Sequence, residues 1–263
     1  MATATGRYTE ERVGVGQTQL YLLKGGSGRP VLALHDVEGH EGWLEFHEAL
    51  AERATVYAPC HPGYGQTPAP EWIGAIPHQA VFYNWFLQEG GLGPADVVGV
   101  GIGGWIAAQM AIMCPEAVRR LVLVDAFGVR PAEGEIADIF VVPWKQVIEA
   151  GFRDPKVSTE YQRLYGEGIP EFGGTREEGR TMSMRMCYRP YMYDPSLPGM
   201  LGKVRAPTLV VWGAQDSIVP VECGRLYQQA IPGARLRVIE ECGHWPHLDR
   251  PRELAAIVGE FLG

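Results

Sequence analysis

The chain has 263 residues, 46% of them hydrophobic and 21% charged, which suffices to bury the core of one large α/β domain or two smaller ones. Its 31 Asp and Glu outnumber its 23 Lys and Arg, for a formal charge of −8, and no basic run could follow a phosphate backbone. This composition excludes a disordered or fibrous chain and argues against a nucleic-acid partner.

The N-terminal segment, MATATGRYTEERV, lacks the apolar core of a signal peptide, and no apolar stretch approaches the ~20 residues that span a bilayer. The five cysteines are scattered and include no C-x-x-C pair, which signals neither a disulfide framework nor a zinc site. We therefore expect reduced thiols, a cytoplasmic location and no membrane partner.

Between Arg12 and about Val129, short β-branched runs alternate with stretches of helical periodicity, which predicts βαβ units and a parallel sheet. The predicted strands are Gln19–Leu23, Val31–His35, Thr55–Ala58, Val97–Val100 and Leu121–Asp125. The predicted helices are Trp43–Arg53, His78–Gln88 and Gly103–Met113. They are expected to cover the faces of the sheet.

The alternation stops from Pro131 to about Met200, where aromatic residues, Met, Arg and Glu predict a mostly helical insertion. It returns with the predicted strands Pro207–Trp212 and Arg235–Ile239 and the predicted helices Val221–Ala230 and Arg252–Leu262. We therefore predict an α/β fold with a mostly parallel sheet of about eight strands. Its core would comprise residues 1–130 and 201–263, with 131–200 inserted as a cap.

The stretch Val97–Trp105, VVGVGIGGW, is a buried strand followed by a sharp glycine-rich turn and a helix. It resembles the nucleophile elbow of the α/β-hydrolase superfamily, G-x-S-x-G, with Gly101 at the nucleophile position. The resemblance implies the α/β-hydrolase fold and a branch that carries a cap, such as esterases, C–C bond hydrolases or haloalkane dehalogenases. It also implies a helix N-terminus facing developing negative charge.

Two later motifs follow the superfamily's order of elbow, acid and base. The turn WGAQD, ending at Asp216, resembles the turn that holds the acid, and GHWPH, with His244, resembles the loop that holds the histidine. The resemblance implies that Asp216 orients His244 as the general base. Asp125, at the end of a predicted strand, is the alternative acid, as in certain dehalogenase relatives.

The segment ALHDV, residues 33–37, stands where the superfamily has a strand ending in His-Gly. By position, the backbone N–H groups of Val37 and Ile102 would form the oxyanion hole, and His35 would be an interior hydrogen-bonding residue. Asp36 replaces the glycine. An inward, ionised carboxylate there would oppose an oxyanion, and a protonated one could donate a hydrogen bond. The residues favour a third arrangement, in which Asp36 turns away and caps the following turn.

Glycine has no atom that could attack a carbonyl, so Gly101 leaves the usual triad incomplete. Three hypotheses follow: a hydrolase in which His244 acts as a base without a serine nucleophile, a silent binding relative, or an engineered replacement of a serine. The NDRG proteins, whose glycine-rich elbows also lack serine, illustrate the second. Cys60 is a weak candidate for a displaced nucleophile.

Other chemistries have less support in the sequence. The glycine-rich turn also fits G-x-G-x-G, but a dinucleotide site needs this pattern at the first βα turn, and it would leave Asp216 and His244 unexplained. The remaining histidines form no i, i+4 ligand pair on a predicted helix, so we predict no metal and no cofactor. We expect a small apolar or aromatic substrate and allow for a homodimer.

Overall fold

The computed structural model describes residues 3–4, 7–169 and 175–263. Nine strands form one sheet in the order β1-β2-β3-β5-β4-β6-β7-β8-β9. The strands are β1 (Thr3–Ala4), β2 (Tyr8–Val15), β3 (Thr18–Gly26), β4 (Arg29–Leu34), β5 (Ala54–Pro59), β6 (Ala95–Val100), β7 (Val118–Val124), β8 (Thr208–Gly213) and β9 (Arg235–Ile239). From β5 to β9 every neighbouring pair is parallel, whereas β1, β2 and β3 pair antiparallel at one edge.

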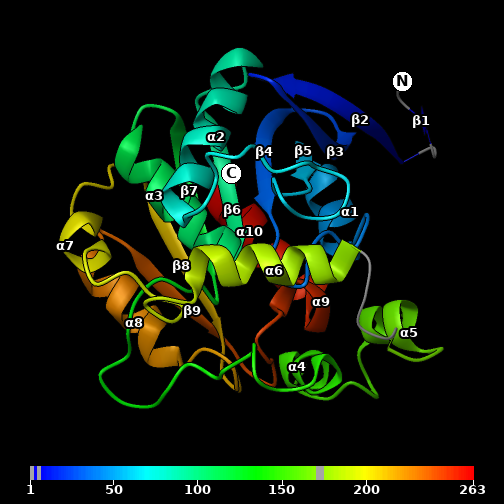
Figure 1. The fold of residues 1–263 in the computed structure, drawn as a ribbon, viewed down its shortest axis with the longest axis vertical. Coiled ribbons are helices and arrows are strands. Elements are labelled where there is room, and N and C mark those ends of the chain that lie inside the picture. Colours follow the sequence, from blue (N-terminus) through cyan, green and yellow to red (C-terminus); the bar gives the residue numbers. More distant parts are fainter. Residues whose placement is uncertain (1–2, 5–6, 170–174) are drawn as a thin grey trace.

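Ten helices are described, and most of them connect the strands. They are α1 (Glu45–Ala51), α2 (Ile76–Glu89), α3 (Ile102–Met113), α4 (Trp144–Gly151), α5 (Thr159–Tyr165), α6 (Thr175–Cys187), α7 (Leu197–Leu201), α8 (Val221–Ala230), α9 (Pro246–Asp249) and α10 (Pro251–Leu262). Helices α2 and α3 pack on each other, as do α1 and α10, and Figure 1 shows α10 behind the strands. No helix among the described residues combines the length and hydropathy needed to cross a membrane.

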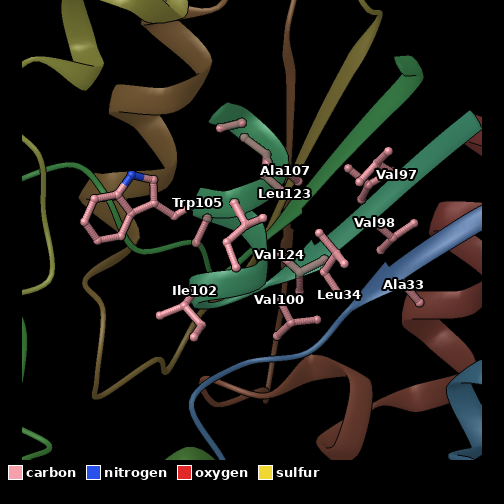
Figure 2. Packing of buried hydrophobic residues seen from close by; sticks show 14 of the residues in the cluster. Ala33, Leu34, Val97, Val98, Val100, Ile102, Trp105, Ala107, Leu123 and Val124 are labelled. Atoms are coloured by element: carbon pink, nitrogen blue, oxygen red, sulfur yellow. The ribbon is translucent and has the colours of Figure 1, made fainter. Parts of the chain in front are cut away.

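The predicted mostly parallel sheet is confirmed, and its central strands explain why the sequence pattern was readable. Every residue of β6 and of β8 is buried, which is typical of strands covered by helices on both faces. Figure 2 shows Val97, Val98 and Val100 of β6 beside Ala33 and Leu34 of β4. This packing fixes the end of β6, from which the glycine-rich turn leads into α3.

The segment between β7 and β8 contains four helices, α4 to α7, where the sequence predicted a helical insertion. Helix α6 crosses in front of the sheet in Figure 1. It is tied to the sheet side by the Tyr64 hydroxyl, which lies 2.6 Å from Ser183 Oγ. The segment therefore lies over the end of the sheet at which the parallel strands finish.

Candidate active site

The turn between β6 and α3 has the backbone of a nucleophile elbow. Gly101 adopts φ 53° and ψ −117°, a region that favours glycine, and its N–H donates to the carbonyl of Val124 at 2.9 Å. The turn is packed so closely that a Cβ on Gly99 would lie 2.2 Å from the carbonyl oxygen of Gly103. These small residues hold the N-terminus of α3 at the edge of the sheet.

Asp216 and His244 form a hydrogen-bonded pair beside this turn. Two backbone N–H groups, of Ile218 and Val219, each donate to Asp216 Oδ1 at 2.8 Å and fix the carboxylate. His244 Nδ1 lies 2.8 Å from Asp216 Oδ2, and the histidine is fully buried. The pair predicted from motif order therefore has the geometry of an acid that orients an imidazole.

Asp125, the alternative acid, lies next to this pair but does not hold the ring. Its Oδ1 accepts the N–H of Gly213 at 2.9 Å. Burial and the neighbouring charge of Asp216 raise the pKa of Asp125 well above its usual value, which favours the neutral acid. Of the two aspartates, Asp216 is the one in hydrogen-bond contact with His244.

Within the part of the chain that the structure describes, Asp125, Asp216 and His244 are the group that could hold a metal ion, with ligand atoms all within 4.8 Å of one another. His244 Nδ1 is already bonded to Asp216, and its Nε2 lies 3.1 Å from another carboxylate, that of Asp36. A metal at this group would have to break the bond between acid and imidazole. The absence of a metal and of a cofactor stays a prediction.

Asp36 does not cap the turn that follows it, and this expectation from the sequence is wrong. Its carboxylate points inward: Oδ1 accepts the N–H of Ile102 at 2.8 Å, and Oδ2 lies 3.1 Å from His244 Nε2 and 3.0 Å from Trp245 Nε1. Three donors outweigh the local preference of an aspartate for an Asx turn. The residue is fully buried.

The inward position of Asp36 depends on the glycine at position 101. A Cβ placed on Gly101 would lie 1.8 Å from Asp36 Oδ1 and 1.9 Å from its Cγ, so no side chain at that position could coexist with this carboxylate. Asp36 thus fills the space at which a side chain on the elbow residue would begin. The two departures from the superfamily pattern are one structural change.

The ionised forms of His244 and Asp36 stabilise each other. Burial alone lowers the pKa of His244, but the charges and hydrogen bonds of Asp216 and Asp36 raise it well above its usual value. Burial has the opposite effect on Asp36 and raises its pKa. Its contacts with His244, Ile102 and Trp245 nevertheless bring that pKa below the usual value. The two carboxyl groups beside the ring therefore favour the protonated form of His244.

Of the two amides predicted for the oxyanion hole, the one of Ile102 already has an acceptor. Ile102 N–H is bonded to Asp36 Oδ1, and Val37 follows Asp36 directly and is buried. An oxyanion on a bound substrate would compete with Asp36 for the Ile102 donor. The Ile102 amide can therefore bind a substrate oxyanion only if Asp36 gives up this hydrogen bond.

His35 and Cys60 are engaged in structural contacts. His35 Nδ1 lies 2.6 Å from the carbonyl oxygen of Asp36, and its Nε2 accepts the N–H of His61 at 2.9 Å. The Cys60 thiol lies 2.9 Å from the carbonyl oxygen of Tyr64, and burial raises its pKa to about 11. A thiol with so high a pKa is a poor nucleophile.

Comparison with known proteins identifies the family. The sequence profile of the Alpha/beta hydrolase family matches residues 26–257, most of the chain. The chain belongs to this family. The match includes strands β4 to β9 and the helical segment between β7 and β8.

This α/β hydrolase is similar to several characterised proteins. It is 30% identical to the dihydrolipoyllysine-residue acetyltransferase component of an acetoin cleaving system of Cupriavidus necator, over 92% of this chain and 66% of that one. It is 27% identical to a 2-hydroxy-6-oxononadienedioate/2-hydroxy-6-oxononatrienedioate hydrolase of Burkholderia vietnamiensis, over 95% and 88%. The fold of a meta-cleavage product hydrolase matches with a TM-score of 0.80 at 22% identity, over 96% and 97%. Family and relatives point to a small-molecule hydrolase.

Sequence reasoning missed two residues of the site of this α/β hydrolase, Trp245 and Glu38. Trp245 was not singled out, although it directly follows His244 and donates to Asp36. Glu38 and His247 form a second buried pair, with Glu38 Oε1 3.5 Å from His247 Nε2. Their positions, two residues after Asp36 and three after His244, were the available signal, because residues that follow site residues on short loops often line the same site.

Proposed function

We propose that this α/β hydrolase cleaves an ester or a carbon–carbon bond of a small apolar or aromatic substrate without a serine nucleophile, using His244 and Asp216 to move the proton. The observation that carries the proposal is the hydrogen bond of 2.8 Å between Asp216 and His244 beside an elbow that holds glycine. Because the elbow has no serine hydroxyl to deprotonate, the pair of acid and imidazole must transfer protons to and from other groups.

The charge state of His244 sets the order of proton transfers. As a nucleophile bonds to the electrophilic carbon and the bond to the leaving group breaks, the protonated ring between Asp216 and Asp36 donates its proton to the leaving group. The neutral ring then takes a proton from the water that releases the product. The general base role predicted from the sequence thus belongs to the second half of the reaction. The first half needs an acid, which the raised pKa of His244 supplies.

Aromatic side chains around the histidine support an apolar or aromatic substrate. The ring of Phe127 lies 5.3 Å from that of His244, and Phe152, which follows α4, packs edge-on against Trp245 at 5.7 Å. Ligand sites are commonly lined by such residues with a few polar groups among them. The relative from Burkholderia vietnamiensis is named as a hydrolase of an oxo-dienedioate, which supports hydrolysis of a small molecule.

The test is the hydrolysis of an activated phenyl ester. We expect turnover by the wild-type chain and its loss in His244→Ala, because the proton donor and acceptor is gone. His78→Ala is the matched control, since His78 is exposed, lies away from the pair and should leave the rate unchanged. A fully active His244→Ala protein would contradict the proposal.

A silent binding protein is the second candidate, and one observation favours it. The carboxylate of Asp36 is a hydrogen-bond partner for His244, Ile102 and Trp245, so these three groups have a partner without any substrate. Binding of an apolar ester without turnover would support this candidate. The hypothesis of an engineered serine replacement has less support, because a side chain at position 101 would require Asp36 to leave its place.

A further inference from the structure

We propose that Asp36 is the nucleophile of this hydrolase, which attacks from the end of β4 in place of a serine at the elbow. The inference rests on the proposed function and adds the group that attacks the substrate. Its basis is position: all three atoms of the Asp36 carboxyl group lie within 2.3 Å of where the Cβ of an elbow side chain would be. The reactive oxygen therefore comes from another strand but reaches the same place.

The contacts of Asp36 are those that an attacking group at this site requires. His244 Nε2 lies 3.1 Å from Oδ2, and the first amide of α3, that of Ile102, lies 2.8 Å from Oδ1. The other buried carboxylates described at this edge have different partners: Asp216 contacts Nδ1 of the ring, Asp125 accepts the N–H of Gly213, and Glu38 lies 3.5 Å from His247 Nε2. Among the described residues, Asp36 is the carboxylate in contact with Nε2, the ring nitrogen that can exchange a proton with the reacting groups.

A carboxylate needs no base to become a nucleophile, because it is already ionised. In the first step an Asp36 oxygen forms a bond to the electrophilic carbon of the substrate, and the bond from that carbon to the leaving group breaks. The leaving group departs with the electron pair and receives the proton of His244. The products are a covalent Asp36 adduct, a neutral imidazole and the protonated leaving group.

The second step regenerates the site with one water molecule. Neutral His244 takes a proton from water, and the hydroxide adds to Cγ of Asp36, which places the new negative charge on Oδ1. The N–H of Ile102, 2.8 Å from Oδ1, is positioned to stabilise this oxyanion. Cleavage of the adduct releases the product and restores the carboxylate and the imidazolium. The Ile102 amide thereby keeps its predicted oxyanion role, on Asp36 and not on the substrate.

This order of bonds predicts where the oxygen of water goes. During repeated turnover of an activated nitrophenyl ester in water enriched in the heavy oxygen isotope, the isotope should enter the carboxyl group of Asp36, seen by mass spectrometry of the peptide that contains it. Protein incubated without the ester controls for slow exchange. In His244→Gln the first step should survive, because nitrophenolate leaves without a proton, and the intact protein should gain the mass of the acyl group.

Two aspartate variants separate the nucleophile from a general effect of lost charge. Asp36→Asn should lose on the order of a thousandfold or more of the rate and form no adduct. Asp96→Asn should keep its rate, since the buried Asp96 pairs with Arg119 at the start of β6, away from the carboxyl ends of the strands. Turnover that depends on His244 but leaves Asp36 unlabelled would overturn the nucleophile and leave the proposed function intact. No turnover at all would overturn both.

Discussion

Residue 101 and residue 36 share one volume, and this is the main feature of the site at the scale of single residues. With glycine at 101, the Asp36 carboxylate reaches the amide of Ile102 and the ring of His244. With any larger residue at 101, the Cβ would lie 1.8 Å from Asp36 Oδ1. The effect of a substitution at either position therefore depends on the residue at the other.

Gly101→Ser alone should not create a serine hydrolase. The new side chain would collide with Asp36, and the displaced carboxylate would lose its donors, so we expect a protein destabilised by about 1–3 kcal/mol or more. The double variant Asp36→Gly with Gly101→Ser should instead react with a fluorophosphonate probe at residue 101. Urea unfolding and probe labelling measure the two effects. If the single variant were labelled as strongly as the double variant, the claim that residues 36 and 101 compete for the same space would be wrong.

At the scale of residues, the sequence was informative where a motif has a known position in the fold. The order of elbow, acid and base led to Asp216 and His244, and these lie 2.8 Å apart. The direction of Asp36 could not be found in the same way, because its partners Ile102 and His244 are 66 and 208 residues distant in the chain. A local turn preference was the only rule available, and distant donors override it.

At the scale of secondary structure, helix α6 is joined to the loop after β5 through a chain of two hydrogen bonds. The hydroxyl of Tyr64 lies 2.6 Å from Ser183 Oγ, which in turn donates to the carbonyl oxygen of Gly179 at 2.9 Å. Both side chains are buried. Because Ser183 donates to Gly179, Tyr64 must donate to Ser183.

This direction of donation predicts unequal costs for removing the two hydroxyl groups. Ser183→Ala leaves the buried Tyr64 hydroxyl without an acceptor and should cost about 1–3 kcal/mol, whereas Tyr64→Phe leaves Ser183 bonded and should cost about 0.5–1.5 kcal/mol. Unfolding in urea measures both, with Tyr188→Phe as an exposed control. A larger loss in Tyr64→Phe would reverse the inferred direction.

The secondary structure was predictable where burial imposes a pattern. The fully buried strands β6 and β8 read as apolar runs and were found. Strands β1 and β2 were missed, because β2 is YTEERVGV, with charged residues at its centre and only its last residue buried. An edge strand with so little burial carries no apolar alternation from which it could be predicted.

At the scale of the whole molecule, most histidines lie inside and are held neutral. Burial lowers the pKa of His40 to about 4 and the pKa values of His47, His61 and His247 to about 3. The unfolded chain binds protons at these residues below about 6.5, where the folded chain does not. The free energy of unfolding should therefore fall as pH falls from about 6.5 towards 4.

The slope of this loss can be tested one histidine at a time. Each such residue contributes up to about 1.4 kcal/mol per pH unit, so His47→Gln should flatten the decline by about that amount, while exposed His78→Ala should not. Urea unfolding between about pH 6.5 and 4 measures it. His244 has the opposite sign: its pKa is raised, so its stabilisation is complete below the ordinary histidine value and is lost as pH rises through the higher folded value. An unchanged slope in His47→Gln would contradict the neutral state of His47.

The collision between an elbow side chain and Asp36 also constrains the routes by which such a site can arise. A chain that starts with serine at 101 and glycine at 36 and changes one residue at a time cannot acquire the inward aspartate first, because its carboxylate would meet the serine Cβ. It can lose the serine first, since glycine adopts the φ of 53° at no steric cost. The viable intermediate has glycine at both positions 36 and 101. A return to serine at position 101 must pass through the same intermediate.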